Sequence, residues 1–498
     1  MLPLRFLYLA PLCAIFTTPV VQGEDAAIPV TTRQDENGVL LNRWFAEGTA
    51  AGNAGDFYDN RDGGHSPFDL SKYPQIAPLR WSVQQITEGK NYGIPWGIRS
   101  EIVLGNASLS GPALNGASIP RILYSNREGH TVLAMQYIGG QLYVYPEHQD
   151  HDPRSSDGLG WGDLYPTNSP YLLISQGSSY TDQPFLAAAA MTLASFPPDI
   201  KRVLKRDQLL LPTFQTLLRR SLKTVQSPKD YLTGVAHPTV FRSEWIDEGK
   251  MMNLAHNMNL ATVPPVFHLE VTGESPPPRP GIDFFEGTGH ASEILANQAM
   301  VIARVFRGMA REREIRVRIA NGHDPLSRSL TYEWRVLRGD PALVKIEQNP
   351  LLREAKITVG YQAEARPIPG TPEITSRRID IGVFAYNGVT YSPPCFITFY
   401  FLPNERRRYD GETGRILETD YSPKDSFVDI TLTSGKQWKD LYRYDETSGA
   451  LLGWTRERKG RPATRYDGEG RRLDPAGPVA VRYETDPVTH LLEEKVIE

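Results

Sequence analysis

The strongest constraint on the fold is a series of short segments in the second half in which apolar and polar residues alternate. Between residues 313 and 319, Ile315, Val317 and Ile319 alternate with charged side chains. This period of two predicts a strand with one buried and one solvated face. Similar segments, rich in β-branched and aromatic residues, occur at 301–306, 330–337, 356–361, 379–385 and 395–401, with the turn signal Asn387-Gly388 before the last. Residues 301–403 are therefore predicted to form a β-sandwich that folds on its own.

Two stretches of this region resemble bacterial PKD and related immunoglobulin-like modules: NGHDPLSRSLTYEWRVLRGD, starting at Asn321, and IDIGVFAYNGVTYSPP, starting at Ile379. In such modules a polar stretch leads into the strand that carries a buried tryptophan, so the resemblance implies that Trp334 is a core residue. The chain departs from the pattern in the acidic loop, where Asp324 is followed by Pro-Leu-Ser-Arg. These modules are usually spacers or binding adjuncts in secreted enzymes, and the fold alone implies no chemistry.

Residues 404–498 contain a repeated motif of arginine, tyrosine and an acidic or polar turn, followed by aliphatic residues. The motif predicts successive β-hairpins whose tyrosines pack beneath the turns. Because the repeats are unevenly spaced, a small meander is expected rather than a solenoid. The units resemble the YD repeats of bacterial surface proteins, and either a capping or a ligand-binding role is open. The repeats begin at Arg408, Arg443, Arg465 and Arg482.

Residues 24–273 are predicted to form an α+β domain with its helices grouped late. A helix over 183–196, capped by Thr181 or Asp182, is followed by helices over 199–205, 212–225 and 245–260. Strands are expected at 101–104, 119–124 and 171–175, and as a pair around Gly139-Gly140 within 131–145. Residues 274–300 begin with a proline-rich stretch and are expected to be a stiff linker and lead-in.

The first 23 residues have the order of a secretory signal peptide: a basic start, an apolar run and small residues before Glu24. The apolar run is too short for the ~30 Å hydrocarbon core of a membrane. No second run approaches that length, so we expect a secreted, periplasmic or extracellular protein without a membrane span in its mature chain. A formal charge of −4 argues against a nucleic-acid partner. One cysteine, Cys395, remains after cleavage, which allows no disulfide within the chain.

Two polar segments of the first region combine residue types that bind metals. One provides Asp59, Asp62 and His65 around a glycine turn, and the other provides His148, Asp150, His151 and Asp152. Carboxylates suit calcium, and imidazole with carboxylate suits transition metals. If the protein is a metal enzyme, the two segments are expected within ~10 Å of each other, since the ligands of one ion surround a common point. The alternative is two solvated loops.

Two further features suggest substrate binding. Ser178 and Ser179 lie between a predicted strand and a helix start, where backbone N–H groups gather, although no phosphate-loop or nucleophile-elbow motif is present. Trp96, Trp161 and Tyr165 offer flat aromatic faces that suit sugar rings if they are exposed, while aromatic residues are also common in cores.

Two functions remain open from the sequence. One is a secreted hydrolase or lyase that acts on an extracellular polysaccharide through the first region, with the other regions as accessory modules. The other is a non-catalytic envelope or extracellular protein that binds carbohydrate or protein. The first accounts for the polar loops of the α+β region, and the second for the absence of a recognisable catalytic triad in the sequence. A divalent metal is expected only with the enzyme.

Export predicts that the mature chain begins at Glu24, because cleavage follows the small residue Gly23. N-terminal sequencing of the protein recovered from the producing cells measures this directly. A chain that begins at Met1 would contradict the assignment.

Overall fold

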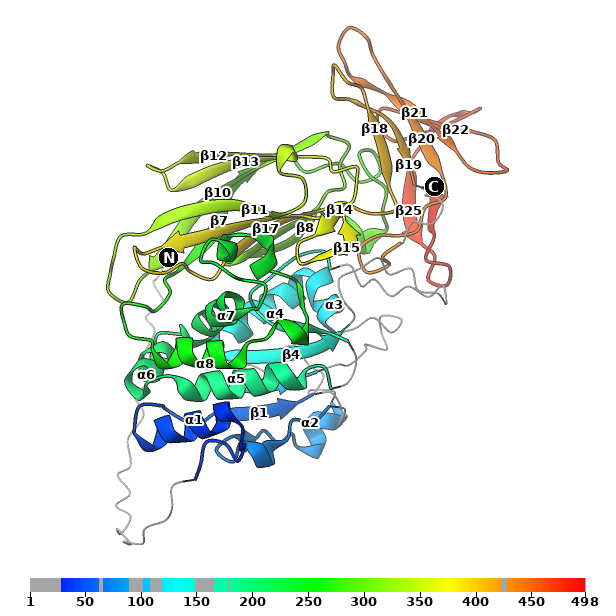
Figure 1. Cartoon of the computed structure of the whole chain (residues 1–498). Helices are drawn as coiled ribbons and strands as arrows, with labels where there is room; N and C mark the ends of the chain where they lie inside the picture. The colour runs from blue at the N-terminus through cyan, green and yellow to red at the C-terminus, as the bar shows by residue number, and fades with distance from the viewer. Residues whose placement is uncertain are drawn as a thin grey trace, which may run out of the picture.

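The computed structural model describes residues 28–61, 66–88, 102–107, 119–147, 165–177, 180–421 and 428–497. Helices and strands are mixed in the first part of the chain, and strands dominate the second half (Figure 1). This coarse organisation agrees with the sequence prediction. Among the described residues, no helix has both the length and the apolar character needed to cross a membrane.

The first part is built on a six-stranded sheet in which every neighbouring pair of strands is parallel. The strand order is β2-β1-β3-β4-β5-β6. Parallel pairing requires crossover connections between the strands, and the helices of this part supply several of them. The strands are β1 (Phe57–Asn60), β2 (Ala77–Pro78), β3 (Val103–Asn106), β4 (Gln141–Glu147), β5 (Leu173–Gln176) and β6 (Val240–Phe241).

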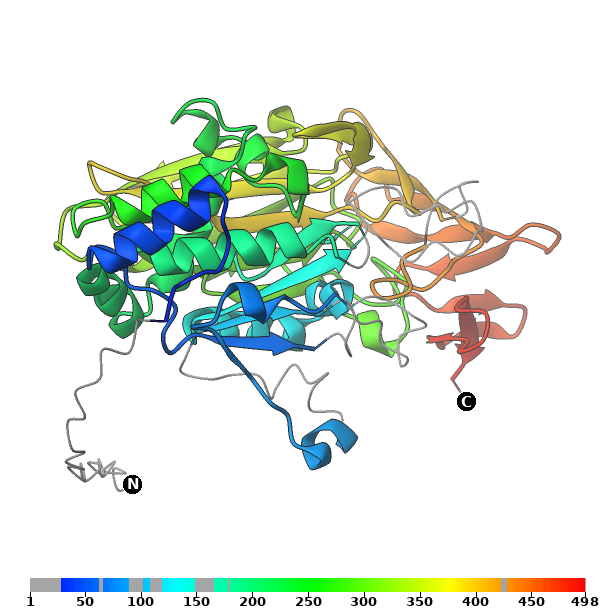
Figure 2. The same ribbon diagram turned by 60° about the horizontal axis from the view of Figure 1, so that its bottom comes forward.

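Helices α4 and α5 pack on this sheet through β4 and β3, and α5 in turn contacts α1, α7 and α8. The short helix α2 stands away from the body on an extended arm (Figure 2), and none of its residues is buried. The helices are α1 (Glu36–Ala46), α2 (Val83–Thr87), α3 (Ile119–Ser125), α4 (Arg127–Ile138), α5 (Gln183–Ser195), α6 (Pro198–Arg206), α7 (Leu210–Ser221) and α8 (Glu248–His256).

The prediction of strands at 119–124 and in the first half of 131–145 is wrong, because these residues form α3 and α4. Asn126 caps α4 by accepting a hydrogen bond from the backbone N–H of Gly129 at 2.6 Å. His130, Leu133 and Tyr137 then recur at helical spacing on the buried side. The predicted late helices and the strand at 171–175 are confirmed, with small shifts of their ends.

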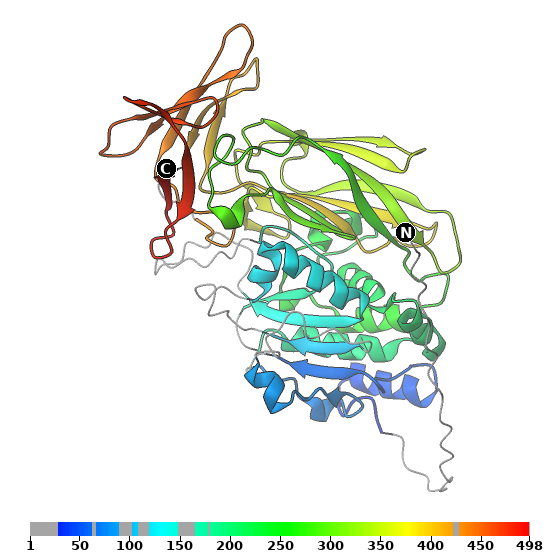
Figure 3. The ribbon, with the colours of Figure 1, turned by 180° about the vertical axis from the view of Figure 1, so that it is seen from behind.

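The second part consists of two sheets that lie against each other as two layers (Figures 1 and 3). One has the order β12-β13-β10-β7 and the other β11-β16-β17-β9-β8. We call β7 to β17 the two-sheet part. Its strands are β7 (Val266–Glu274), β8 (Ile294–Gln298), β9 (Val301–Val305), β10 (Glu312–His323), β11 (Thr331–Arg338), β12 (Val344–Asn349), β13 (Glu354–Gly360), β16 (Ile379–Tyr386) and β17 (Cys395–Tyr400), with the separate hairpin β14 (Arg366–Ile368) and β15 (Thr371–Ser376).

The two-sheet part differs in two ways from an independent module over 301–403. Strand β7, which the sequence places in the first region, pairs with β10 over much of its length. Strand β17 is buried along its whole length and β16 nearly so. A strand is buried on both faces only when other elements cover each face. Here the first part of the chain covers one face of β16 and β17. The buried apolar side chains of the two parts accordingly form one continuous core.

The third part is a meander of seven strands that follow one another in sequence order, with a separate final hairpin. Its apolar core is distinct from that of the other parts and contains mostly aromatic side chains. The strands are β18 (Arg406–Tyr409), β19 (Ile416–Asp420), β20 (Lys439–Tyr444), β21 (Leu451–Glu457), β22 (Thr464–Asp467), β23 (Arg472–Asp474), β24 (Gly477–Val479), β25 (Val481–Thr485) and β26 (Leu492–Val496).

The four repeated motifs share one turn geometry. In each, the aspartate or the equivalent acid accepts hydrogen bonds from backbone N–H groups two and three or four residues later, which forms an Asx turn. A residue with positive φ follows and returns the chain to the next strand. The acids are Asp410, Asp445, Asp467 and Asp486, and the positive-φ residues are Gly414, Gly449, Gly470 and His490. Tyr466 and Tyr483 of these motifs are buried, whereas Tyr409 and Tyr444 are half-buried.

The proline-rich segment connects β7 to the core of the third part, rather than the first region to the second. After it, Phe285 lies fully buried among Tyr421, Trp438, Trp454 and Tyr483, with ring centroids 5.2–6.3 Å away. Beside it, the Glu286 carboxylate accepts from Lys436 at 2.7 Å and from Arg307 at 3.1 Å. The segment over 274–300 thus carries part of the core of the hairpin meander.

Replacing Phe285 with alanine should destabilise the third part by roughly 3–5 kcal/mol, because it removes a fully buried ring from an aromatic core. Guanidinium unfolding followed by tryptophan fluorescence reports on this core through Trp438 and Trp454. Val488→Ala is the control, since Val488 is 83% exposed in a hairpin turn. Equal unfolding midpoints for the two variants would contradict the placement of Phe285.

Candidate functional site at the carboxyl edge of the parallel sheet

The edge of the first sheet at which its strands end is the candidate site. In parallel sheets the carboxyl ends of all strands lie at one edge, and ligands bind there where the strand order reverses. The chain runs from β1 out to β2 and then returns past β1 to β3. The reversal therefore lies between the ends of β1 and β3, which are Asn60 and Asn106.

Asp59, one of the predicted metal ligands, is buried on one face of this edge. Its Oδ1 accepts from the indole N–H of Trp81 at 2.7 Å. Its Oδ2 accepts from the Tyr143 hydroxyl and from Arg61, both at 2.6 Å. Both carboxylate oxygens are thus occupied by protein donors, and a metal ion bound here would have to displace one of them.

A glycine allows this cluster to span three strands. Asp59 of β1, Gly105 of β3 and Tyr143 of β4 are aligned in one row of the sheet. A Cβ at position 105 would lie 2.2 Å from the Tyr143 ring, so the ring occupies the space that any other side chain would take. The guanidinium of Arg61 lies 4.6 Å from the centroid of this ring and 5.3 Å from that of Trp81. This stacking of a cation on two aromatic faces stabilises the charged pair.

A second polar cluster forms around Asn106, whose side chain points to the other face because it alternates with Gly105. Asn106 accepts from the Tyr58 hydroxyl at 2.6 Å and donates to the backbone carbonyl of Ser66. The Ser66 hydroxyl donates to Oδ1 of Asp182 and accepts from the backbone N–H of Tyr180 at 2.9 Å. This chain of bonds links β1 and β3 to the start of α5.

Asp182, one of the two capping residues that the sequence predicts, occupies the N-cap position of α5 but makes no capping hydrogen bond through its side chain. Its Oδ1 accepts from Ser66 instead, and its Oδ2 is buried with no hydrogen-bond partner among the described residues. Burial raises the pKa of this carboxyl group above its usual value because the charged form is poorly solvated. A buried carboxyl group with a raised pKa is one of the features that mark candidate acid–base residues.

Backbone strain is concentrated at the same place. Ser66 and Tyr180 are non-glycine residues with φ of 47° and 74°, and Gly177 has φ of 112°. Left-handed conformations cost of order 1–3 kcal/mol each in non-glycine residues such as Ser66 and Tyr180, whereas glycine adopts them readily, and such strained residues occur often at functional sites. They hold Ser66 against Asp182 at the end of the sheet.

Most of the sequence-predicted site residues lie outside the described residues: Asp62, His65, Trp96, His148, Asp150, His151, Asp152, Trp161, Ser178 and Ser179. Several nevertheless belong to segments that follow the ends of described strands directly, namely β1, β4 and β5. One strand separates β1 from β4, so the ends of these two strands lie about 10 Å apart at the usual strand spacing. Within the described residues, no group of three or more metal-binding side chains is present.

Tyr165 lies in the protein interior, where its ring packs edge-on against that of Tyr124 at 5.6 Å. Its face is therefore not open to a sugar ring, in contrast to the expectation of an exposed aromatic platform. The backbone carbonyl of Tyr165 accepts a hydrogen bond from Arg378 of the two-sheet part. Tyr165 thus contributes to the packing between the first part and the two-sheet part, an interface that we call the seam.

The sequence did not single out Ser66, Asn106, Arg61 or Tyr143 as site residues. Asp182 was noted only as a capping residue. The position of Asn106 at the end of β3, next to the point where the strand order reverses, is the signal that identifies it. No local pattern marks the bond between Ser66 and Asp182, which are separated by 116 positions.

No protein-family model matches this chain, and no curated protein matches it.

The raised pKa of Asp182 predicts a pH-dependent effect of Asp182→Asn on stability. The folded wild-type protein holds the proton of Asp182 more tightly than the unfolded chain does. The stability that this proton adds is complete below the pKa of the unfolded state and is lost as the pH rises through the pKa of the folded state. The neutral amide does not titrate. Urea unfolding from pH 4 to pH 7 should therefore show the variant gaining stability relative to wild type as the pH rises. A difference that is constant with pH would contradict the raised pKa.

Proposed function

We propose that the first part is a hydrolase that acts on an extracellular polysaccharide at the carboxyl edge of its sheet. Asp182 is the proposed acid–base residue. The observation that carries the proposal is its buried carboxyl group, which has a raised pKa and, within the described part of the chain, one oxygen without a hydrogen-bond partner. At neutral pH such a group retains a proton more readily than an exposed aspartate and can donate it to a leaving oxygen.

The chemistry is that of glycosidic bond hydrolysis. Asp182 protonates the oxygen that leaves with one sugar fragment, and a water molecule supplies the hydroxyl that the other fragment receives. The second proton of that water restores the proton that Asp182 gave up, so the residue ends the cycle as it began. The amides and hydroxyls near this carboxyl group, from Asn106, Ser66 and Gln183, are the types that recognise sugar hydroxyls. Asp59 is fixed by Arg61 and serves as a stationary negative charge in the same edge.

The second candidate is a non-catalytic protein that binds carbohydrate or an envelope component. It is favoured by the burial of Asp59, Ser66 and Asp182, whose side chains are inaccessible to solvent. In this case the polar network would serve to stabilise the end of the sheet, and binding would involve the β-rich parts. Saturable binding of a polysaccharide without turnover distinguishes this candidate from the enzyme.

We further propose that the two-sheet part is an immunoglobulin-like sandwich of the PKD type and that the third part is a set of YD-like hairpins. Trp334 is buried on β11, in agreement with the role that the resemblance assigns to it. Asp324, at the position of the acidic loop, accepts from Arg328 at 2.8 Å and from Asn387 at 2.7 Å. The Asp324 carboxylate is thus held by protein donors.

Export to the periplasm or the exterior remains a proposal that rests on the order of residues 1–23. A divalent metal also remains a proposal. It rests on the carboxylates and histidines that follow the ends of β1 and β4 in the sequence, Asp62, His65, His148, Asp150, His151 and Asp152. Neither proposal is needed for the role of Asp182.

The proposed function predicts that Asp182→Asn lowers the release of reducing sugar ends by roughly 10²–10⁴-fold, which is the usual contribution of a general acid. The purified mature protein and the variant are compared on a panel of bacterial and plant polysaccharides, with ultraviolet absorbance to detect the unsaturated ends that a lyase would produce. Asp199→Asn is the matched control, because Asp199 is an exposed acid in the first turn of α6.

Activity of the wild type and of Asp199→Asn with loss in Asp182→Asn supports the proposal. Full activity of Asp182→Asn, while the variant remains folded by circular dichroism, would contradict the assignment of the acid. Binding of a polysaccharide without any product would favour the second candidate.

A further inference from the structure

A cavity of about 230 Å³ lies in the seam between the first part and the two-sheet part. Its walls come from α4, from the turn between α6 and α7, from β7 and β10, and from the turn between β8 and β9. Figure 1 shows α4 and α7 on the side of the first part that faces the two-sheet part. Cavities between domains are a common place for small-molecule sites.

The inner wall of the cavity is apolar and aromatic. Tyr137 and Tyr171 are buried there with their rings edge to face, 5.4 Å apart, and Met300 lies beside them. At the rim, Ile138 remains 45% exposed although it lines the cavity. An apolar ligand would remove this side chain from water, which is favourable. The volume exceeds the ~150 Å³ of a cavity that holds benzene.

The mouth of the cavity is polar and is shaped by an irregularity in β10. The register between β10 and β7 shifts between Ala320 and His323, and Asn321 has φ of 49°. A bulge of this kind redirects side chains. It places Asn321 and His323 at the mouth with His268 of β7, and the Asn321 amide lies 3.4 Å from Nδ1 of His268.

The charges around the mouth select against ionic ligands. Among the described residues that line the cavity, none is lysine or arginine, so an anionic group would meet no permanent cation on these walls. The one carboxylate, Asp207, is held by both Nε and Nη2 of Arg206 at 2.7 and 2.8 Å. Burial lowers the pKa of His268, which favours its neutral imidazole. A neutral imidazole and an amide each offer one donor and one acceptor side to a hydroxyl or amide group.

We propose that this seam cavity binds an uncharged aromatic ligand of one or two fused rings with a hydroxyl or amide group. The ring system lies against Tyr137, Tyr171 and Met300, and the polar group reaches His268 and Asn321. The site is separate from the carboxyl edge and does not depend on the function proposed for that edge. Because both parts contribute walls, an occupied cavity also strengthens the seam.

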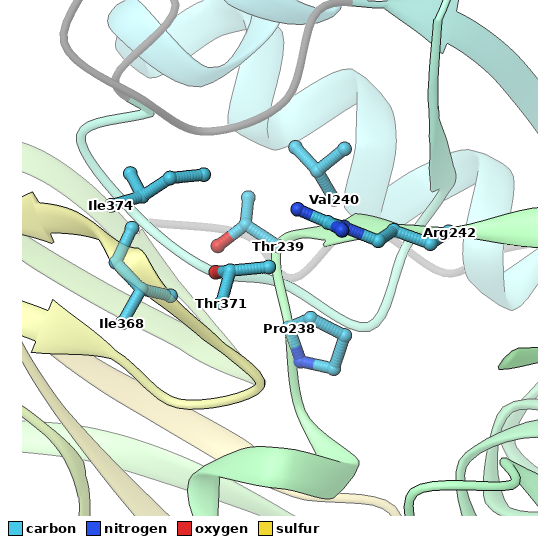
Figure 4. Close-up of a pocket in the computed structure, with 7 residues that line it drawn as sticks. All are labelled: Pro238, Thr239, Val240, Arg242, Ile368, Thr371 and Ile374. Carbon is cyan, nitrogen blue, oxygen red and sulfur yellow. The ribbon is translucent and has the colours of Figure 1, made fainter.

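A second cavity in the same seam does not have these properties. It lies between β6 and the β14–β15 hairpin, where Thr239 and Val240 face Ile368 and Ile374 (Figure 4). Its volume is about 20 Å³, which is enough for one water molecule. The comparison shows that the larger cavity is not a general feature of the packing between the two parts.

The test uses 2-naphthol, a fluorescent bicyclic ring with one hydroxyl group, and the purified mature chain. Titration should give saturable binding, and an increase in the melting temperature should accompany it, since the ligand binds only the folded state. Naphthalene-2-sulfonate, which has the same rings and an anionic group, should bind at least ~10-fold more weakly, because the described walls of the cavity carry no lysine or arginine. Equal binding of the two probes would overturn the neutral-ligand assignment.

Two variants locate the binding. Ala134→Trp fills the cavity from α4 and should weaken 2-naphthol binding by ~10-fold or more, and His268→Phe removes one hydrogen-bonding group and should weaken it by roughly 5-fold. Ala342→Trp is the control, because Ala342 is exposed and does not line the cavity. No saturable binding by the folded wild type up to the solubility limit of the probe would overturn the proposal, as would unchanged binding by folded Ala134→Trp. Asp182→Asn should bind normally, which separates this outcome from that of the carboxyl edge.

Discussion

The arrangement of the first two parts depends on a buried guanidinium group. Arg378, at the start of β16, is inaccessible to solvent and pairs with Asp380 at 2.8 Å. It also donates to the carbonyls of Tyr165 and Thr167, and to the Thr239 hydroxyl at 2.6 Å, all in the first part. A buried charge is tolerated only when it is paired and hydrogen-bonded, so neither part can satisfy this group alone. Since β5 begins at Leu173, six residues after Thr167, the same contacts hold the segment that leads into one of the strands ending at the candidate site.

The apolar seam around this group has the composition of a domain core rather than of a transient interface. Tyr231 of the first part packs against Phe384 of β16 at 5.7 Å and donates its hydroxyl proton to the carbonyl of Ser392. The buried guanidinium of Arg219 in α7 lies over Phe396 of β17. The third part is attached differently. Phe285 and Glu286 follow the proline-rich segment and lie in the aromatic core of the third part. The molecule thus combines one large shared core with a smaller one.

Patterns of neighbouring residues predicted those strands and turns whose conformation depends on nearby residues. They failed for elements whose conformation depends on contacts with residues far away in the sequence. The alternation in β10 was visible because one of its faces is solvated, and the repeated turns were visible because each aspartate binds its own backbone. Strands β7 and β8 were missed, since their identity depends on pairing with strands further along the chain. At the candidate site, Asp59 was found from its acidic neighbourhood, whereas Asp182 acquires its unusual environment from Ser66, which lies far away in sequence. Conversely, Tyr165 was judged from its residue type alone, and its burial follows from the seam.

The central claim is that the first part and the two-sheet part are one cooperative unit with a shared core. Hydrogen exchange measured by mass spectrometry at increasing urea concentrations tests it, because peptides from β4 and β5 and peptides from β16 and β17 are resolved separately. The account predicts that both sets lose protection at the same urea concentration. Protection of β16 and β17 that survives after β4 and β5 have exchanged fully would show that the two-sheet part folds alone, and would contradict the account.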